Sequence, residues 1–293
     1  MAMTLVTTAR GGDRRIVVAG MFSTGHAYDR FMGRWSRTLA PRFVRFAAVR
    51  DGEAVLDVGS GTGALAAAVA ALAPSTTITG IDPAASYVEI ADALHAGRAR
   101  FEVGDAQRLR FVDGRFDRTL SLLALNFVPD PERALDEMVR VTRCGGTVAA
   151  AVWDYGNGME MLRVFWDEAI ALTPAADRQD ERYMPLCRPG ELGALWREHR
   201  LEETCEEALT IQTRFSSFED YWSPYLEGQG PAGAYVAALA PGRRDEFRLR
   251  LRRRLIGDGA DRPIVLRARA WAVRGLVPLE VRHRRPLVRT PLK

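Results

Sequence analysis

The stretch Val55-Leu56-Asp57-Val58-Gly59-Ser60-Gly61-Thr62-Gly63-Ala64-Leu65 decides the fold of this chain. It begins as a short apolar run, continues through three alternating glycines and ends in an alanine-rich segment of helical length. Glycine adopts positive φ angles easily and lets a ligand approach the backbone, because it has no Cβ atom. The stretch therefore predicts a strand, a tight turn and a helix, which together form the first part of a βαβ unit.

The same alternation of short β-rich runs and helix-length segments continues to about residue 155. We expect strands at residues 54–58, 76–81, 100–103, 118–123 and 147–152, and helices at residues 64–73, 85–96 and 131–141. Such alternation is typical of parallel strands joined by crossover helices. The predicted fold class is α/β, a Rossmann-like doubly wound sheet that is mostly parallel, with an antiparallel edge strand and a helical cap insertion.

The segments on either side of this region have a less regular pattern. We expect helices at residues 35–46, 159–172, 191–199, 218–226 and 243–255, and strands at residues 209–215 and 264–273. The helices between the last two strands are interpreted as a cap at about residues 216–258. The predicted organisation is a disordered extension at residues 1–20, one domain at residues 21–275 and a basic tail at residues 276–293.

Composition limits the class of protein. The 293 residues are 47% hydrophobic, which is enough for a large core, and the net charge is +4. No apolar run approaches the roughly 18–20 residues of a membrane-spanning helix, and residues 1–20 do not resemble a secretory signal. Cys144, Cys187 and Cys205 are widely spaced and form no CxxC pair that would indicate a metal site or a redox motif. We expect a soluble cytoplasmic protein that has neither a metal site nor a membrane partner.

Two carboxylates follow the next two predicted strands. Asp82 ends one strand and lies 19 residues after Gly63, and Asp105 follows the next strand in the sequence Val103-Gly104-Asp105-Ala106. The carboxyl ends of parallel strands meet at one edge of a doubly wound sheet, where nucleotides bind. A carboxylate there can accept hydrogen bonds from ribose hydroxyls or from the amino group of adenine. The pattern predicts a nucleoside-containing cofactor.

The spacing of the glycines argues against a dinucleotide cofactor. The turn has the pattern GxGxG and not GxGxxG, and Asp57 stands where dehydrogenases usually have an apolar residue. The chain also has no GxxxxGK[ST] phosphate-binding loop. A cofactor without phosphate groups fits the turn better.

With these motifs, residues 28–155 resemble the class I S-adenosylmethionine-dependent methyltransferases of the small-molecule type. They are most similar to the ubiquinone and menaquinone biosynthesis C-methyltransferases. The resemblance implies that S-adenosylmethionine is the cofactor and S-adenosylhomocysteine the product. It assigns the methionine and ribose portions to Gly59, Ser60, Gly61 and Gly63, the ribose hydroxyls to Asp82 with Pro83, the adenine to Asp105 with Ala106, and the cofactor amino group to Asp57.

The resemblance also suggests residues on the acceptor side of the site. His26, Tyr28, Arg34 and Trp35 lie in a segment that folds over the cofactor in related enzymes, Asn126 follows the fourth strand, and Trp153 follows the fifth. For each of them, packing or solvation is an alternative role. No catalytic residue is identified. His26, Tyr28 or Asp154 could serve as a general base, and a helix cap or a solvated loop residue is the favoured alternative for Asp154.

Methyl transfer to a small-molecule acceptor is the leading hypothesis, with the O, N or C acceptor atom undecided. One alternative is a cofactor-binding regulatory subunit without catalysis. A second is a nucleic-acid methyltransferase, because residues 243–293 contain 16 basic and 5 acidic residues, a net charge of +11. Against it, Phe247, Leu251 and Leu255 recur at helical spacing, which indicates an amphipathic helix with solvated arginines. No base-methylating D/N-P-P-Y/W motif follows the fourth strand. The oligomeric state is not indicated.

Overall fold

The protein is represented by a computed structural model that describes residues 29–279. The predicted extension at residues 1–20, the candidate residues His26 and Tyr28, and the part of the basic tail at residues 280–293 lie outside this range. Residues 276–279 of the predicted tail are described, and Leu276 is the last residue of a strand.

One seven-stranded sheet forms the centre of the fold. Its strands, in spatial order, are β3 (Arg100–Val103), β2 (Thr77–Asp82), β1 (Ala54–Val58), β4 (Phe116–Leu122), β5 (Thr142–Trp153), β7 (Ile264–Leu276) and β6 (Glu202–Phe215). The first five strands are parallel, and β7 runs antiparallel to both β5 and β6. The α/β fold class, mostly parallel with an antiparallel component near one edge, is confirmed.

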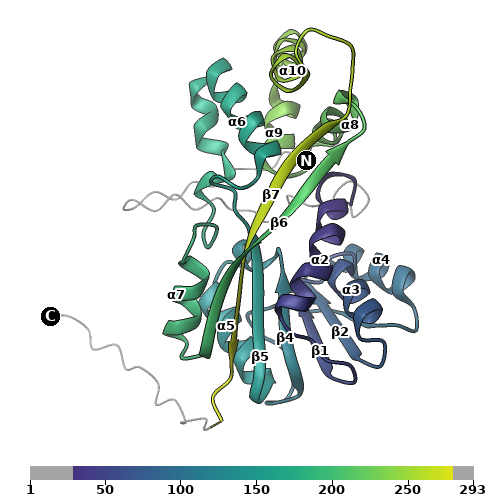
Figure 1. Ribbon diagram of the computed structural model, residues 1–293, viewed down its shortest axis with the longest axis vertical. Helices are drawn as coiled ribbons and strands as arrows, with labels where there is room; N and C mark the ends of the chain where they lie inside the picture. Colours follow the sequence, from purple (N-terminus) through teal and green to yellow (C-terminus); the bar gives the residue numbers. More distant parts are fainter. Residues whose placement is uncertain (1–28, 280–293) are drawn as a thin grey trace, which may run out of the picture.

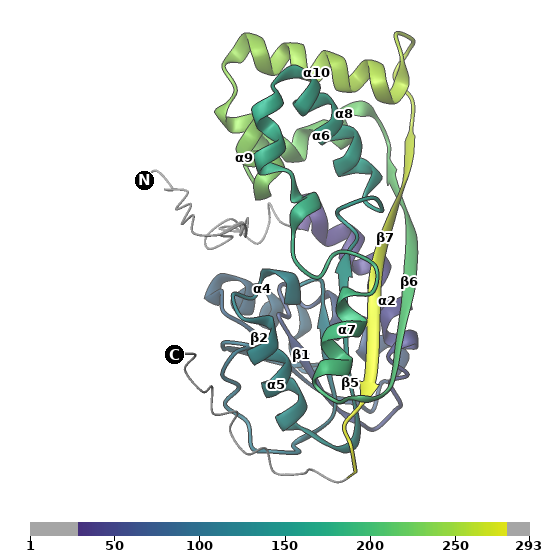
Figure 2. The same cartoon turned by 90° about the vertical axis from the view of Figure 1, so that its left-hand side faces the viewer.

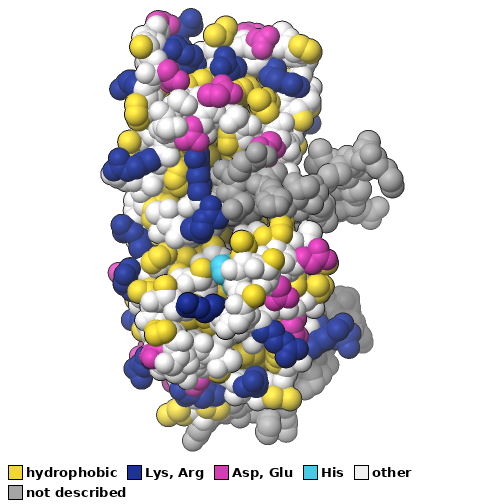
Figure 3. Space-filling model, turned by 90° about the vertical axis from the view of Figure 1, so that its right-hand side faces the viewer, with side chains coloured by type: hydrophobic (Ala, Val, Ile, Leu, Met, Phe, Trp, Pro, Cys, Tyr) yellow, Lys and Arg dark blue, Asp and Glu magenta, His cyan; other side chains and the backbone are white. Residues whose placement is uncertain are grey.

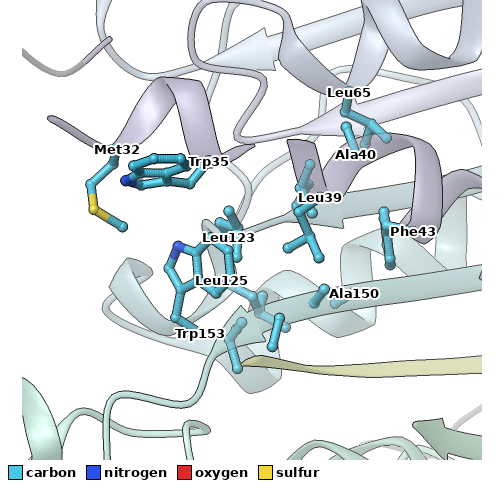
Figure 4. Packing of buried hydrophobic residues seen from close by; sticks show 14 of the residues in the cluster. Met32, Trp35, Leu39, Ala40, Phe43, Leu65, Leu123, Leu125, Ala150 and Trp153 are labelled. Carbon is cyan, nitrogen blue, oxygen red and sulfur yellow. The ribbon is translucent and has the colours of Figure 1, made fainter. Parts of the chain in front are cut away.

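Helices cover both faces of the sheet, as expected for a doubly wound fold. Figure 1 shows α5 (Pro131–Val141) and α7 (Glu191–Glu198) on one side, and α2 (Arg34–Phe46), α3 (Ala64–Leu72) and α4 (Ala85–His95) on the other. Because helices bury both faces, the central strands are almost continuously apolar. In β5 the run from Val148 to Val152 is fully buried. Figure 4 shows Ala150 of this run packed with Leu39 and Phe43 of α2.

Strands β6 and β7 extend well beyond the rest of the sheet. β6 begins seven residues before the predicted range 209–215, and β7 ends three residues after the predicted range 264–273. The two strands pair along their whole length, from Glu202 opposite Leu276 to Phe215 opposite Ile264. The partners of β5 on β7 are only residues 270–276, so the other half of the hairpin projects as a two-stranded ribbon (Figures 1 and 2). The first half of β6 is polar because it lies at the sheet edge, and the apolar pattern therefore did not reveal it.

A layer of helices sits at the projecting end of this hairpin (Figure 2). It contains α6 (Glu160–Leu172), α8 (Phe218–Trp222), α9 (Gly230–Ala238) and α10 (Pro241–Ile256), with short 3-10 segments at Pro174–Gln179, Glu181–Tyr183 and Ser223–Glu227. Its core is aromatic: Phe165 stacks on Tyr225 with ring centroids 4.7 Å apart and meets Phe247 edge-on at 5.0 Å. The layer extends beyond the expected residues 216–258 because α6 packs against α10.

Candidate active site

The glycine turn between β1 and α3 has the backbone that its sequence predicts. Gly59, Gly61 and Gly63 have φ angles of +76°, +52° and +86°. The amides of Gly59 and Ser60 donate to the carbonyl oxygen of Ile81 on the neighbouring strand. A Cβ atom on Gly59 would lie 2.3 Å from the Cβ of Ala124, whereas one on Gly61 would have no atom within 4 Å. The turn therefore packs tightly at Gly59 and faces open space at Gly61.

Asp82 ties this turn to the end of β2. One carboxylate oxygen accepts a hydrogen bond from the Gly61 amide at 3.0 Å, and the other accepts from the Ala84 amide at 2.9 Å. Burial raises the pKa of Asp82 above its ordinary value, and these two hydrogen bonds oppose the rise. The side chain thus stands beside the turn with its position fixed by backbone donors.

Asp57 is a buried carboxyl group that no close hydrogen-bond donor satisfies within residues 29–279. The residue is 1% exposed, and neither oxygen has a partner at hydrogen-bond distance in that range. Burial and the neighbouring Asp82 charge raise its pKa to about 8, and the nearby backbone amide of Ala66 partly opposes the rise. The hydroxyl of Ser60 is buried and unpartnered in the same part of the chain. Because buried polar groups are rarely left unpaired, Asp57 and Ser60 are suited to a ligand that donates hydrogen bonds.

These groups line a hollow of about 350 Å³, part of which opens to solvent. We call it the donor hollow. Its lining residues are Gly33, Ser36, Asp57, Gly59, Ser60, Gly61, Thr62, Ala64, Leu65 and Leu122. Among residues 29–279, this lining contains a carboxyl group and no Lys or Arg, so it suits a ligand with positively charged groups better than a phosphate.

Asp105 and Ala106 lie beside Asp82 but outside the lining of the donor hollow. The amide of Gly104 donates to the Asp82 carbonyl oxygen at 3.1 Å, which places the end of β3 next to the end of β2. Asp105 is exposed, and its carboxylate accepts hydrogen bonds from the backbone and side-chain amides of Gln107. Pro83 is also exposed. The fold thus brings the three predicted motifs to one edge of the sheet.

A second hollow lies between the sheet and the helical layer, and it spans about 370 Å³ when the space open to solvent is included. We call it the acceptor-side hollow. Its lining residues are Phe31, Met32, Phe127, Tyr155, Leu162, Glu181, Met184, Gly230 and Pro231. The two hollows are neighbours, because Met32 lines one and the adjacent Gly33 lines the other. No motif in the sequence pointed to Glu181 or to its apolar surroundings.

The remaining described candidates on the acceptor side, Arg34, Trp35, Asn126 and Trp153, are not among the lining residues of either hollow. Arg34 donates to Asp220 of α8 at 2.8 Å and lies over the ring of Trp35. Trp35 and Trp153 are both buried in the core between α2 and the sheet (Figure 4). Asn126 is buried, and its amide nitrogen has no partner among residues 29–279.

Asp154, a candidate base, is already engaged by other groups. Its carboxylate accepts hydrogen bonds from the Asn157 amide and from both Nε and Nη2 of Arg269, the first two at 2.9 Å. The side chain is almost fully buried. Asp154 therefore links the end of β5 to β7.

Within residues 29–279, each helix is too short or too polar to span a lipid bilayer. In the same part of the chain, no group of three or more His, Cys, Asp and Glu side chains is arranged to hold a metal ion.

Comparison with known proteins agrees with this geometry. Residues 56–150 match the family model described as a methyltransferase domain. Over 202 residues the chain is 29% identical to an uncharacterized protein of Mycobacterium bovis, covering 67% of this chain and 73% of the relative. Over 100 residues it is 37% identical to the ubiquinone/menaquinone biosynthesis C-methyltransferase UbiE of Geotalea daltonii, covering 32% of this chain and 43% of that protein.

Solved structures show the same fold. A crystal structure described as a putative methyltransferase from Bacillus halodurans superimposes with a TM-score of 0.54 at 18% identity. The match covers 82% of this chain and 99% of the other chain. At this level of identity, the similarity concerns the arrangement of helices and strands and not the substrate.

Proposed function

We propose, from the premise that this chain has the domain and the fold of the class I S-adenosylmethionine-dependent methyltransferases, that it transfers a methyl group to a small-molecule acceptor. The observation that carries the proposal is the donor hollow. There, the unpartnered carboxyl of Asp57 lies beside a glycine turn that Asp82 holds in place. S-Adenosylmethionine has an ammonium group, a sulfonium and no phosphate, and these features complement the carboxyl groups and the absence of Lys and Arg in the lining.

The chemistry that the cofactor supplies when bound is a methyl group activated by the positive charge of its sulfur. The protein then needs to align the acceptor and to exclude water, and it needs no covalent nucleophile. In this proposal Asp57 and Ser60 pair with the amino-acid end of the cofactor, and Asp82 accepts the ribose hydroxyls beside Pro83. Asp105 and Ala106 take the adenine.

The residues between the two hollows form a wall that both bound molecules would contact. Asn126 has a buried amide nitrogen that no group within residues 29–279 accepts from, and it directly precedes Phe127, which lines the acceptor-side hollow. We infer that Asn126 donates to one of the two bound molecules. Trp35 and Trp153 then support this wall from the core, and Arg34 fixes the start of α2 to the helical layer through Asp220.

Calorimetric titration with S-adenosylhomocysteine tests the proposed donor site. We expect binding to the native chain and a loss in Asp82→Ala of about 1.5–3 kcal/mol, since that is the typical contribution of a hydrogen bond to a charged group. The loss corresponds to roughly a 10- to 150-fold rise in Kd. Glu207→Ala, which removes an exposed carboxylate from β6, is the matched control. Absence of binding to a folded native sample would refute the proposal.

The raised pKa of Asp57 predicts that cofactor binding releases a proton. With a pKa of about 8 the Asp57 carboxyl is largely protonated at pH 7, and an ammonium group bound beside it favours the charged form and lowers the pKa. Binding of S-adenosylhomocysteine at pH 7 should therefore release up to about one proton, and the affinity should rise between pH 6 and pH 8. Titrations in buffers of different ionisation enthalpy measure this release. Asp57→Asn has no carboxyl group that titrates at this position. It should therefore show neither the proton release nor the rise in affinity between pH 6 and pH 8 that Asp57 causes.

The surface of the helical layer supports a small-molecule acceptor over a nucleic acid. Arginines of α10 pair with acidic residues of the same layer: Arg243 with Glu246, Arg248 with Glu219, Arg250 with Glu168 and Arg253 with Asp258. Figure 3 shows basic and acidic side chains intermixed at this end of the molecule. Phosphate binding would compete with these pairs, because each would have to release its arginine.

A further inference from the structure

The acceptor-side hollow combines an apolar lining with a single carboxyl group. Its walls include the aromatic rings of Phe31, Phe127 and Tyr155 and the side chains of Met32 and Met184. Of the lining residues within the described part of the chain, Glu181 is the only acidic one. The residue is 5% exposed, so its carboxyl group is largely withdrawn from solvent. Burying a carboxylate in such surroundings is costly unless a partner compensates the charge.

The protein neutralises the neighbouring carboxylate but not Glu181. Asp180 accepts hydrogen bonds from the guanidinium groups of both Arg163 and Arg182. Glu181 accepts a hydrogen bond from the indole Nε1 of Trp166, which is an uncharged donor. Among residues 29–279, Glu181 forms no ion pair. A cation that enters the hollow would supply the missing charge.

The aromatic lining favours the same kind of ligand. The faces of aromatic rings attract cations, and the attraction is stronger where water is excluded. Methionine side chains adapt to apolar groups of varied shape. The three rings and the carboxylate together favour a positively charged group attached to an apolar body, in preference to a neutral or an anionic ligand.

We propose that the acceptor is an apolar amine, and that Glu181 binds its ammonium group and accepts a proton from it. This inference rests on the methyl transfer proposed above. It identifies nitrogen as the acceptor atom and gives the chain a general base, neither of which the sequence indicated.

The steps balance in atoms and charge. The ammonium group gives one proton to the Glu181 carboxylate and becomes a neutral amine with a free electron pair. The amine nitrogen then forms a bond to the methyl carbon of the donor, while the carbon–sulfur bond breaks and its electron pair stays on sulfur. The products are a methylated ammonium ion, S-adenosylhomocysteine and a protonated Glu181, which returns its proton to solvent.

The charges around Glu181 allow it to gain and lose a proton near neutral pH. Burial raises the pKa of Glu181 to about 7, and the Trp166 hydrogen bond opposes the rise. The charge of Asp180 raises the pKa further, whereas that of Arg163 lowers it. The hydroxyl of Tyr225, which belongs to the 3-10 segment after α8, is a further titratable group that interacts with Glu181. A general base is most effective when its pKa lies near the working pH.

Binding of a simple aromatic amine tests the inference without turnover. The probe is 2-phenylethylamine, titrated calorimetrically at pH 8 into the full chain with S-adenosylhomocysteine present, and 2-phenylethanol is the neutral comparison. We expect the amine to bind at least about tenfold more tightly than the alcohol. Glu181→Gln, which keeps an oxygen for Trp166, should remove this preference, and Glu207→Gln should retain it.

The readouts separate the two proposals. If S-adenosylhomocysteine does not bind, the methyl-transfer proposal fails, and the same amine titration without it still tests the hollow. If S-adenosylhomocysteine binds equally to the native chain and to Glu181→Gln, the variant is folded. Equal binding of the amine and the alcohol to the native chain, or equal amine binding by the native chain and the folded Glu181→Gln, would overturn the inference.

Discussion

Replacement of Arg118 by alanine is expected to lower the free energy of unfolding by about 3–5 kcal/mol, the range for breaking a buried ion pair from one side. Arg118 lies on β4 and forms a bidentate pair with Glu53, which precedes β1. The two side chains are only 8% and 12% exposed. The alanine variant would leave the Glu53 carboxylate buried without its partner.

Arg118 also binds parts of the chain that the pair with Glu53 does not reach. Its Nη1 donates to the carbonyl oxygen of Ala47 at 2.7 Å and to the hydroxyl of Thr147 at 2.8 Å. One guanidinium group therefore joins the end of α2 and the strands β1, β4 and β5. The variant removes donors from both acceptors, and each is then left unsatisfied in the interior.

Denaturant-induced unfolding followed by circular dichroism measures the effect. Arg118→Lys keeps the charge but not the planar, forked geometry, so we expect a loss between that of the native chain and that of Arg118→Ala. In a double-mutant cycle with Glu53→Ala, the two losses should not add, because both variants break the same pair. A loss below about 1 kcal/mol in Arg118→Ala would contradict this account.

The sequence predicted the parallel half of the fold because local signals and the tertiary environment agree there. The strand at residues 100–103 and the helix at residues 131–141 have the predicted bounds. In the helix, Pro131 at the start and the N-cap Asp130 are strong local signals. Strand β6 was predicted only over its second half, since the polar residues from Glu202 onward carry no apolar alternation. The helix α9 was missed because its glycines and alanines have almost no amphipathic pattern.

The candidate site also contains some residues that could be predicted from the sequence and others that could not. The turn, Asp82 and Asp105 could be predicted, because each follows directly from a strand that the pattern reveals. Glu181 could not be predicted, because it lies in a short 3-10 segment and reaches the acceptor-side hollow only through the packing of α6, α9 and the helical turn Asp29–Gly33 that precedes α2. Contacts between residues that are distant in sequence decide such positions, and a single sequence does not contain them.

Replacement of Gly59 by alanine is expected to destabilise the fold by roughly 2–5 kcal/mol and to abolish measurable binding of S-adenosylhomocysteine. Two costs add: the φ of +76° disfavours a residue with a Cβ by about 1–2 kcal/mol, and overpacking adds about 1–3 kcal/mol. The overpacking arises because the new Cβ would lie 2.3 Å from that of Ala124. Relief of that contact displaces the turn, and with it the ends of β1 and the segment before Asn126.

Two further variants separate these costs. Gly61 also has a positive φ, but a Cβ there would meet no atom within 4 Å, so Gly61→Ala should lose only the roughly 1–2 kcal/mol of backbone strain. In the double variant Gly59→Ala with Ala124→Gly, the colliding methyl group is removed, so part of the lost stability and of the cofactor affinity should return. Thermal unfolding and calorimetric titration of the three variants measure both quantities. If Gly59→Ala and Gly61→Ala were equally destabilised, the contact between the turn and residue 124 would not be what holds the donor hollow in shape, because only the first of the two variants disturbs that contact.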